Sequence, residues 1–327
     1  MTPKKTEDPH DLSNLEGVGP ATRTKLHESG INTVLDIKTL GPSQIADMTG
    51  MNFDKAHELF MLAIKYLVAR HEETDILRTA NDVLEERKHI DRIITGAPMF
   101  DNFLKGGIET CAITELYGAF GCGKTQICHT LCVMVQLPKE KGGLDAKALY
   151  VDTEGTFRPE RIASMAQAKG LDVDTALNNI LVAKAQSSGQ QEIIVQSAGK
   201  LITDNNIKLI IVDSATSHYR SDFLGRGTLA DRQQRLSGFL KMLHRLADTY
   251  KLAIVITNQI IHSPDVMFGN PERAVGGNIM AHASTYRIGL RRGAKNTRVA
   301  RFVDSPSHEE SEAIFSLQDG GIEDVTE

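Results

Sequence analysis

The sequence predicts an α/β protein, with a mainly parallel, doubly wound sheet that follows a small all-α domain. From about residue 93 onwards, strand-like apolar runs alternate with helical segments, which favours a parallel sheet with helices on both faces. The first seventy residues show only helix-like patterns. We therefore expect an N-terminal domain at residues 1–70, a linker at residues 71–92 and a larger core at residues 93–327.

A helix-hairpin-helix is the unit expected in the N-terminal domain. The stretch LEGVGPATRTKLHESGI, residues 15–31, has the pattern of a tight glycine turn between two helices. Gly17 and Gly19 free the backbone for the turn, and amides at the start of the next helix can meet a phosphate. DNA contact and packing alone both remain open for this motif. A further helix is expected at Phe53–Leu67, and the charged linker is expected to contain a short helix.

The core contains six candidate strands. They are Cys111–Tyr117, Ala148–Asp152, Leu209–Asp213, Leu252–Asn258, Tyr286–Arg291 and Val299–Asp304. Leucines recur at helical spacing within Arg232–Tyr250, which predicts an amphipathic helix. Ligands of such sheets bind at the carboxyl ends of the strands.

Composition and charge restrict the class of protein. The 327 residues are 41% hydrophobic and 24% charged, which is ordinary for a soluble globular protein. No run reaches the roughly 20 apolar residues that span a bilayer, and the polar N-terminus lacks the apolar core of a signal peptide. We therefore expect no membrane partner. The net charge of −5 counts mildly against nucleic-acid binding, although local basic loops can still contact phosphates.

The cysteines indicate free thiols rather than a metal site. Cys111, Cys122, Cys128 and Cys132 form no Cys-x-x-Cys pair, and no histidine pair completes a zinc site. Unpaired thiols of this kind are typical of a reducing compartment.

The strongest motif is a complete P-loop, G-x-x-x-x-G-K-[ST], between a candidate strand and a helical run. Its residues are Gly118, Ala119, Phe120, Gly121, Cys122, Gly123, Lys124 and Thr125. The glycines let backbone amides surround the phosphates of a nucleotide. Lys124 is expected to reach the outer phosphates, and Thr125 to hold Mg²⁺.

Two acidic residues that follow apolar strands complete the expected site. Asp213 ends Leu209–Asp213, as in a Walker B element, and is expected to organise Mg²⁺. Glu154 follows another strand, on the same edge as the P-loop if the sheet is parallel, where a carboxylate could deprotonate the attacking water. An ordinary surface carboxylate is the competing interpretation of Glu154.

Several long motifs carry a family resemblance. GAFGCGKTQICHTL, VDTEGTFRPERI, LIIVDSATSHYRSDFLGRGTLADRQQRL, VITNQI and VGGNIMAHAST occur in this order. From Leu12 to Asp324 the chain closely resembles the archaeal RadA family of strand-exchange proteins, in the RecA superfamily. The resemblance implies a RecA-like ATPase core that uses ATP and Mg²⁺, forms filaments on single-stranded DNA and exchanges strands with double-stranded DNA. It also implies self-assembly into filaments or rings, recombination mediators as partners, and a cytoplasmic, nucleoid-associated location.

The resemblance assigns roles around the nucleotide. Glu154 resembles the catalytic glutamate, and Gln259 resembles the sensor that links the γ-phosphate to a DNA-binding loop. Lys124 acts with them. The remaining implied contacts are Gln126, Arg161, which stacks on adenine, and His282 and Asp304, which act on the ATP of a neighbouring subunit.

The resemblance also implies two DNA-facing segments and a polymerisation motif. Arg220–Arg232 resembles the first DNA loop, and Ile260–Asn278 resembles the second. The implied DNA contacts are Arg220, Arg226, Arg232, Phe268, Arg273, Gly276 and Gly277. An ordinary solvated face is the competing interpretation for the arginines, and Phe268 could instead fold onto its own domain. Leu77 and Ala80 stand at the two fixed positions of the polymerisation motif.

The chain departs from the family at several positions. Leu77 replaces a phenylalanine that fills a pocket on the next protomer, and Glu309 replaces a proline that packs on adenine. Ala119 stands where an acid is common, and Cys122 replaces a small hydroxyl residue. A regulatory paralogue that binds ATP and partner proteins but does not polymerise is therefore the main alternative. A ring-forming ATPase without a DNA role is a third.

Overall fold

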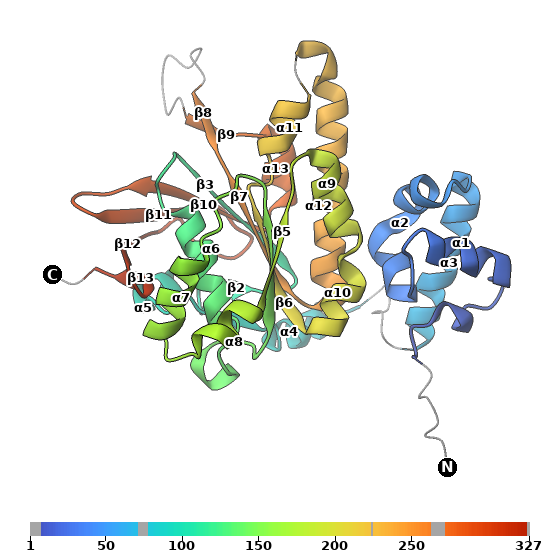
Figure 1. The fold of residues 1–327 in the computed structure, drawn as a ribbon, viewed down its shortest axis with the longest axis horizontal. Coiled ribbons are helices and arrows are strands. Elements are labelled where there is room, and N and C mark those ends of the chain that lie inside the picture. Colours follow the sequence, from blue (N-terminus) through green and yellow to red (C-terminus); the bar gives the residue numbers. More distant parts are fainter. Residues whose placement is uncertain (1–7, 71–77, 224, 263–271, 326–327) are drawn as a thin grey trace. The chain divides into compact units, whose positions relative to one another are not determined.

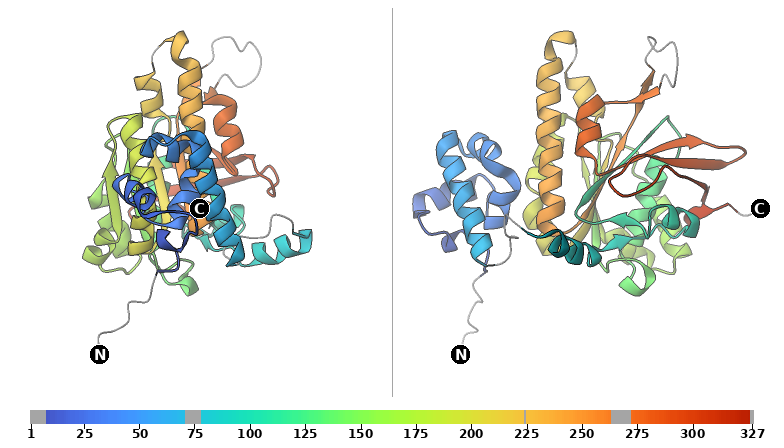
Figure 2. Two further views of the ribbon diagram at one scale, coloured as in Figure 1. Left: turned by 90° about the vertical axis from the view of Figure 1, so that its right-hand side faces the viewer. Right: turned by 180° about the vertical axis from the view of Figure 1, so that it is seen from behind.

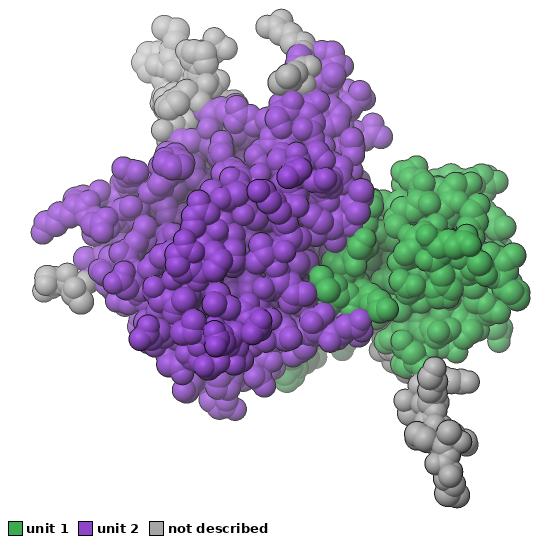
Figure 3. Space-filling model, viewed as in Figure 1, with its two compact units in different colours: residues 1–89, 196–201 green, residues 90–195, 202–327 purple. Residues whose placement is uncertain are grey.

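The computed structural model describes residues 8–70, 78–223, 225–262 and 272–325. The chain divides into two compact units, which Figure 3 colours separately. The first comprises Met1–His89 together with Gln196–Leu201, and the second comprises Ile90–Val195 and Ile202–Glu327. In the part of the chain that the structure describes, no helix combines the length and apolar character that crossing a membrane needs.

The first unit is helical, as expected. Its helices are α1 (Pro20–Glu28), α2 (Val34–Thr49), α3 (Phe53–Ala69) and α4 (Ala80–Lys88). The expected helix before the glycine turn is only a 3₁₀ turn at Leu12–Asn14, and Gly17 has a φ of +88° that favours glycine. Thr33 starts α2 through a reciprocal capping box with Asp36.

Helix α4 begins at the predicted polymerisation residue Ala80. Thr79 caps it, and none of its residues is buried. Leu77, the other member of the predicted motif, lies outside the described residues.

The second unit is built on a twisted sheet of nine strands in the order β13-β12-β11-β10-β3-β7-β6-β4-β5. Its strands are β3 (Ala112–Gly118), β4 (Lys147–Asp152), β5 (Ile180–Lys184), β6 (Ile207–Asp213), β7 (Ala253–Asn258), β10 (Tyr286–Arg292), β11 (Thr297–Asp304), β12 (Glu312–Gln318) and β13 (Gly321–Asp324). The strands from β10 to β5 pair in parallel, whereas β11, β12 and β13 are antiparallel additions at one edge. The predicted mainly parallel sheet is therefore confirmed.

Two small ribbons accompany the main sheet. They are β1 (Arg92–Ile93) with β2 (Ile108–Glu109), and β8 (Ile260–His262) with β9 (Glu272–Ala274). The helices of this part of the chain are α5 (Pro98–Phe103), α6 (Lys124–Met134), α7 (Pro159–Ala168), α8 (Val173–Asn178), α9 (Ser188–Gln196), α10 (Ala198–Asn205), α11 (Ser217–Asp222), α12 (Leu229–Tyr250) and α13 (Gly277–Ala283). Helices cover both faces of the sheet (Figures 1 and 2).

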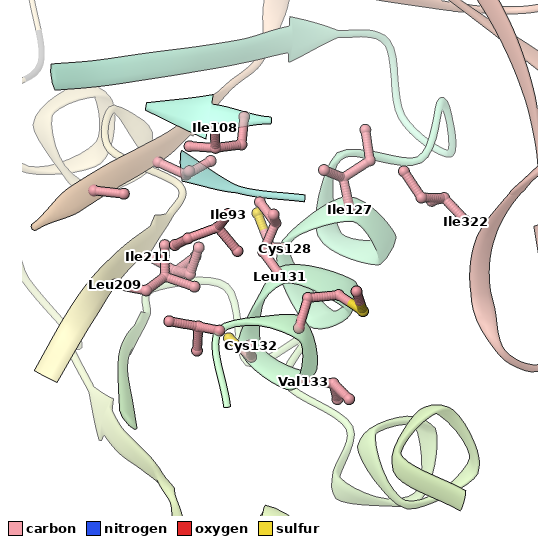
Figure 4. Close-up of a cluster of buried hydrophobic side chains, with 14 of the residues drawn as sticks. Ile93, Ile108, Ile127, Cys128, Leu131, Cys132, Val133, Leu209, Ile211 and Ile322 are labelled. Atoms are coloured by element: carbon pink, nitrogen blue, oxygen red, sulfur yellow. The ribbon is translucent and has the colours of Figure 1, made fainter. Parts of the chain in front are cut away.

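Helix α6 crosses the sheet and is buried along most of its length. Its Cys128 and Leu131 lie in one apolar cluster with Leu209 and Ile211 of β6 (Figure 4). Helix α12 contributes the expected leucine face, in which Leu240 and Leu243 are fully buried. Because α6 starts at Lys124, within the P-loop motif, its burial fixes the position of that loop relative to the sheet.

The sequence analysis found six strands of the main sheet but missed β5, β12 and β13. β5 is an edge strand with alternating burial, and β12 is partly exposed. The apolar stretches in them are short, at residues 180–183 in β5 and 313–315 in β12, and stretches of this length do not by themselves distinguish a strand from a helical segment.

His129 is an unusual buried group on α6. Neither ring nitrogen has a hydrogen-bond partner among the described residues, and the ring lies against the aromatic rings of Tyr150 and Phe157. Burial lowers the pKa of His129 to about 4 from 6.5, against the opposing effect of the Asp213 carboxylate. The imidazole is therefore neutral in the folded protein at neutral pH.

Acid should destabilise the second unit through His129. The unfolded chain binds a proton at this residue below about pH 6.5, whereas the folded chain does so only near pH 4. The stability that neutral His129 contributes is thus complete above pH 6.5 and is lost as the pH falls towards 4. In His129→Leu, the loss of unfolding free energy between pH 7 and pH 4.5 should be smaller by about 2 kcal/mol.

Guanidinium titrations followed by circular dichroism at the two pH values measure this difference. The exposed His57 provides the control, because His57→Gln should leave the pH dependence unchanged. Equal pH dependence in His129→Leu and the wild type would contradict the assignment.

Candidate functional site

The P-loop connects β3 to α6 and adopts a backbone that only glycine tolerates at key positions. Gly118 has a φ of +155°, and a Cβ atom there would lie 2.2 Å from the carbonyl oxygen of Leu290 on the neighbouring strand β10. Gly123 has a φ of +105° and directly precedes α6. The first-turn amides of α6 have no intrahelical partners, so they favour an anion at this end of the helix.

A cavity of about 540 Å³ lies at this edge of the sheet. Its lining includes the P-loop residues Gly118, Ala119, Phe120, Gly121, Gly123, Lys124 and Thr125, and also Gln126, Glu154, Asp213 and Gln259. The predicted P-loop, the Walker B acid, the predicted catalytic glutamate and the predicted sensor are therefore brought together. Phe120 is 96% exposed at the tip of the loop.

Lys124 and Cys122 lie on the inner side of the P-loop. The Lys124 ammonium donates hydrogen bonds to the carbonyl oxygens of Gly118 at 2.8 Å and Ala119 at 3.0 Å. Its Nζ is 3.7 Å from the sulfur of Cys122. Cys122 is fully buried, so its thiol packs beneath the loop rather than facing the cavity.

Asp213 is held by hydroxyl groups from three different elements. Its Oδ2 accepts hydrogen bonds from Thr125 Oγ1 at 2.8 Å and Tyr150 OH at 2.7 Å, and its Oδ1 accepts one from Thr257. Thr125 and Asp213 thus place a hydroxyl and a carboxylate oxygen side by side at the cavity wall. Hard oxygen donors of this kind fit Mg²⁺, which commonly uses one or two protein ligands together with phosphate oxygens and water.

Glu154 is oriented by two side chains that directly follow the strands β6 and β7. Its Oε1 accepts hydrogen bonds from Ser214 Oγ at 2.9 Å and from Gln259 Nε2 at 2.8 Å. Glu154 therefore has defined partners inside the cavity, which disfavours the alternative of an ordinary surface carboxylate.

The segment that carries Glu154 is held in place by Asp152. The carboxylate of Asp152 accepts hydrogen bonds from the backbone N–H groups of Glu154, Gly155, Thr156 and Phe157. Such a carboxylate replaces the partners that the irregular backbone lacks. The sequence analysis did not assign this role to Asp152. The pattern Asp-x-Glu-Gly-Thr after a strand was the available signal.

Arg161 borders the site from α7. Its guanidinium donates to Gln126 Oε1 at 3.1 Å and to the carbonyl oxygens of Gln318 at 2.7 Å and Asp319 at 3.1 Å. The Arg161 side chain thereby joins α6 to the turn between β12 and β13. The predicted adenine contact of Arg161 stays a prediction.

His282 and Asp304 do not line this cavity. His282 lies in α13 and Asp304 ends β11, and both side chains are exposed. Their predicted action on a neighbouring subunit's nucleotide stays a prediction.

The first predicted DNA loop is more helical than the sequence analysis implied. Arg220 lies in α11 and is exposed, whereas Arg232 lies in α12 and is half-buried. Arg226 lies in a short 3₁₀ turn between these helices. The irregular part is therefore confined to the residues between Asp222 and Leu229.

The second predicted DNA segment begins at β8 and ends at α13. Arg273 lies in β9, and Phe268 lies outside the described residues. Gly276 and Gly277 have φ values of +85° and +55°, so both occupy the left-handed region that favours glycine. A Cβ atom at Gly276 would lie 2.4 Å from Met280 Cγ.

Comparison with known proteins gives a consistent result. A family model described as Rad51 matches residues 86–325, and a model of a SAM-like helix-hairpin-helix tandem matches residues 10–61. The chain is 48% identical over 317 residues to the DNA repair and recombination protein RadA of Cenarchaeum symbiosum, covering 97% of this chain and 80% of that protein. It is 46% identical over 315 residues to the protein of the same name from Aeropyrum pernix, covering 96% and 97%. These matches confirm the resemblance and the predicted fold class.

Thiol reactivity should follow burial. Cys122, Cys128 and Cys132 are buried. Burial raises the pKa of the Cys128 and Cys132 thiols well above the ordinary value for cysteine. Since the thiolate is the reactive form, only Cys111, which is half-buried, should react quickly with a disulfide reagent in the folded protein. The absorbance of the thiolate released from the reagent should show one fast-reacting thiol in the folded protein.

Two variants make this measurement decisive. Cys111→Ser should abolish the fast phase, and Cys122→Ser should preserve it. Loss of the fast phase in Cys122→Ser would show instead that the P-loop thiol is accessible.

Proposed function

The chain belongs to the Rad51 family, and we propose that it is a recombinase, a DNA-dependent ATPase that forms filaments on single-stranded DNA. In this function it pairs and exchanges homologous strands in recombinational DNA repair. The observation that carries the proposal is the convergence of Lys124, Asp213, Glu154 and Gln259 on one cavity. The names of the two similar proteins, both of which refer to DNA repair and recombination, support the same function.

The cavity provides the groups that ATP and Mg²⁺ require. The N-terminal amides of α6 and the ammonium of Lys124 would hold the phosphates. Thr125 and Asp213 would hold Mg²⁺, which supplies neutralising charge on the phosphate oxygens when it is bound. Gln126 and Arg161 lie where α6 meets the β12–β13 turn, which suits contact with the remainder of the nucleotide.

Glu154 is the group that would activate water. A carboxylate is a suitable general base when it lies within hydrogen-bond reach of the attacking water. The hydrogen bonds from Ser214 and Gln259 occupy the same oxygen, Oε1, so Oε2 stays available to accept a proton. Gln259 also directly precedes the second DNA-facing segment, so it can relate the state of the nucleotide to that segment.

Assembly would complete the site. His282 and Asp304 are exposed and lie outside the cavity, as expected for groups that act on the nucleotide of the next protomer. Leu77 and Ala80 would make the contact between protomers. Exposed Arg220 would contact DNA phosphates together with Arg226, Arg232 and Arg273. The amides of Gly276 and Gly277 would meet the DNA backbone, and Phe268 would insert between bases. A cytoplasmic, nucleoid-associated location and recombination mediators as partners follow from this function.

A regulatory paralogue is the second candidate function. Leucine at position 77 and glutamate at position 309 both replace residues that resembling proteins use for assembly and for the adenine cap. A paralogue of this kind would bind ATP and partner proteins without forming filaments.

ATP hydrolysis with and without single-stranded DNA tests the proposal. DNA should stimulate hydrolysis by the wild type, and Lys124→Ala should lower it by at least about a hundredfold, since the lysine contacts the transferred phosphate. Electron microscopy of the same samples should show filaments. Nucleotide binding without stimulation or filaments would support the regulatory paralogue instead.

Asp152→Asn should slow hydrolysis more than it weakens ATP binding. The amide replaces one acceptor oxygen by an N–H₂ group that faces backbone N–H donors, so the segment carrying Glu154 should shift. A loss of about tenfold in kcat is expected, with the Kd for ATP nearly unchanged.

Asp172 provides the matched control for Asp152. Its carboxylate caps α8 through Thr175 and likewise accepts a backbone hydrogen bond, but it lies outside the cavity lining. Asp172→Asn should hydrolyse ATP as the wild type does. If both variants lose kcat equally, Asp152 has no specific role in positioning Glu154.

A further inference from the structure

Two adjacent amide side chains, Asn258 at the end of β7 and Gln259 directly after it, contact different parts of the protein. Gln259 lies in the cavity lining and donates to Glu154. Asn258 is 0% exposed and makes its contacts inside the protein. Since successive side chains of an extended chain point in opposite directions, the pair connects the nucleotide site with the interior behind it.

Asn258 uses its amide group in three directions. Its Oδ1 accepts a hydrogen bond from Thr216 Oγ1 at 2.8 Å. Its Nδ2 donates to Glu115 Oε1 at 2.7 Å and to the carbonyl oxygen of Val275 at 2.8 Å. Both N–H donors of the amide are thereby satisfied.

A buried ion pair sets the orientation of this amide. Glu115 is 0% exposed on the central strand β3, and its other oxygen accepts a hydrogen bond from Arg287 Nε at 2.6 Å. Both oxygens of Glu115 accept hydrogen bonds, Oε2 from Arg287 and Oε1 from Asn258, so the Nδ2 of Asn258 faces this carboxylate. The Oδ1 of Asn258 must then face Thr216.

The contacts of Asn258 with Thr216 and with Val275 connect it to one end of each DNA-facing segment. Thr216 directly precedes α11, and its carbonyl oxygen accepts a hydrogen bond from the backbone N–H of Arg220. Val275 directly precedes Gly276, and its backbone N–H donates to the carbonyl oxygen of Gln259 at 3.0 Å. Val275 is therefore held from both sides by the Asn258–Gln259 pair.

We propose that Asn258 is a positioning residue that couples the nucleotide site to both DNA-facing segments. Gln259 reports the state of the Glu154 site, and Asn258 transmits any displacement of this pair to Thr216 and to Val275 together. The inference rests on the proposed DNA-dependent ATPase function and adds the residue through which DNA stimulation passes.

The test compares two buried amides that differ in their surroundings. Gln136 donates to the carbonyl oxygens of Cys132 and Ala176 and accepts from Asn179, so, like Asn258, it is a buried amide with three hydrogen bonds. It joins α6 to α8 and touches neither DNA-facing segment. Asn258→Ala and Gln136→Ala therefore each remove three hydrogen bonds of a buried amide. Only Asn258→Ala removes the connection to Thr216 and Val275.

ATP hydrolysis is measured for both variants and for the wild type, with and without single-stranded DNA, together with the Kd for ATP. Asn258→Ala should reduce the stimulation by DNA about tenfold, within the usual range of coupling between sites. Its unstimulated rate and Kd should change by less than about threefold, since Asn258 does not line the cavity. Gln136→Ala should keep full stimulation.

Thr216→Val provides a second variant of nearly unchanged volume, which keeps the test decisive if Asn258→Ala does not fold. It removes only the hydroxyl that donates to Asn258 and should also reduce stimulation. Full stimulation in these junction variants, or an equal loss in Gln136→Ala, would overturn the inference while the proposed function stands. A wild type that DNA does not stimulate would contradict the proposed function, and this inference with it.

Discussion

The parallel direction of four neighbouring strands is the constraint on which the site depends. β3, β7, β6 and β4 are adjacent and parallel, so their carboxyl ends meet at one edge of the sheet. The P-loop, Gln259, Asp213 and Glu154 follow or end these strands in that order. Segments that are distant in the sequence therefore share one cavity without any long excursion of the chain.

Asp213 shows how this edge is prepared for a cation. Its hydrogen-bond donors are the neutral hydroxyls of Thr125, Tyr150 and Thr257, and no ion pair to it is formed among the described residues. Neutral hydroxyl donors satisfy the hydrogen-bonding capacity of the oxygens without contributing a positive charge. Mg²⁺ bound at this point would supply the positive charge that these hydroxyls lack.

The carboxyl edge of the sheet also leads from the cavity into both proposed DNA-facing segments. The proposed second DNA-facing segment directly follows Gln259, and α11 of the proposed first segment follows the strand that ends at Asp213. Each proposed segment is continuous with a strand that contributes to the cavity. The buried pair of Glu115 and Arg287 adds rigidity behind this edge, where a hydrogen-bonded amide has only one satisfactory orientation.

The sequence by itself determined the features that depend on local backbone and fixed spacing. These include the P-loop at Gly118–Thr125, the apolar strand that ends in Asp213, the glycine turn at Gly17 and the leucine face of α12. Glycines at positive φ and continuous apolar runs leave a direct trace in the sequence. Only the tertiary structure decided that Glu154 and Gln259, 105 residues apart, share a hydrogen bond. It likewise decided that Asn258 joins Thr216 to Val275, and that the region from Arg220 to Arg232 is helical at both ends. These features depend on strand order, register and packing between distant segments, which no local pattern encodes.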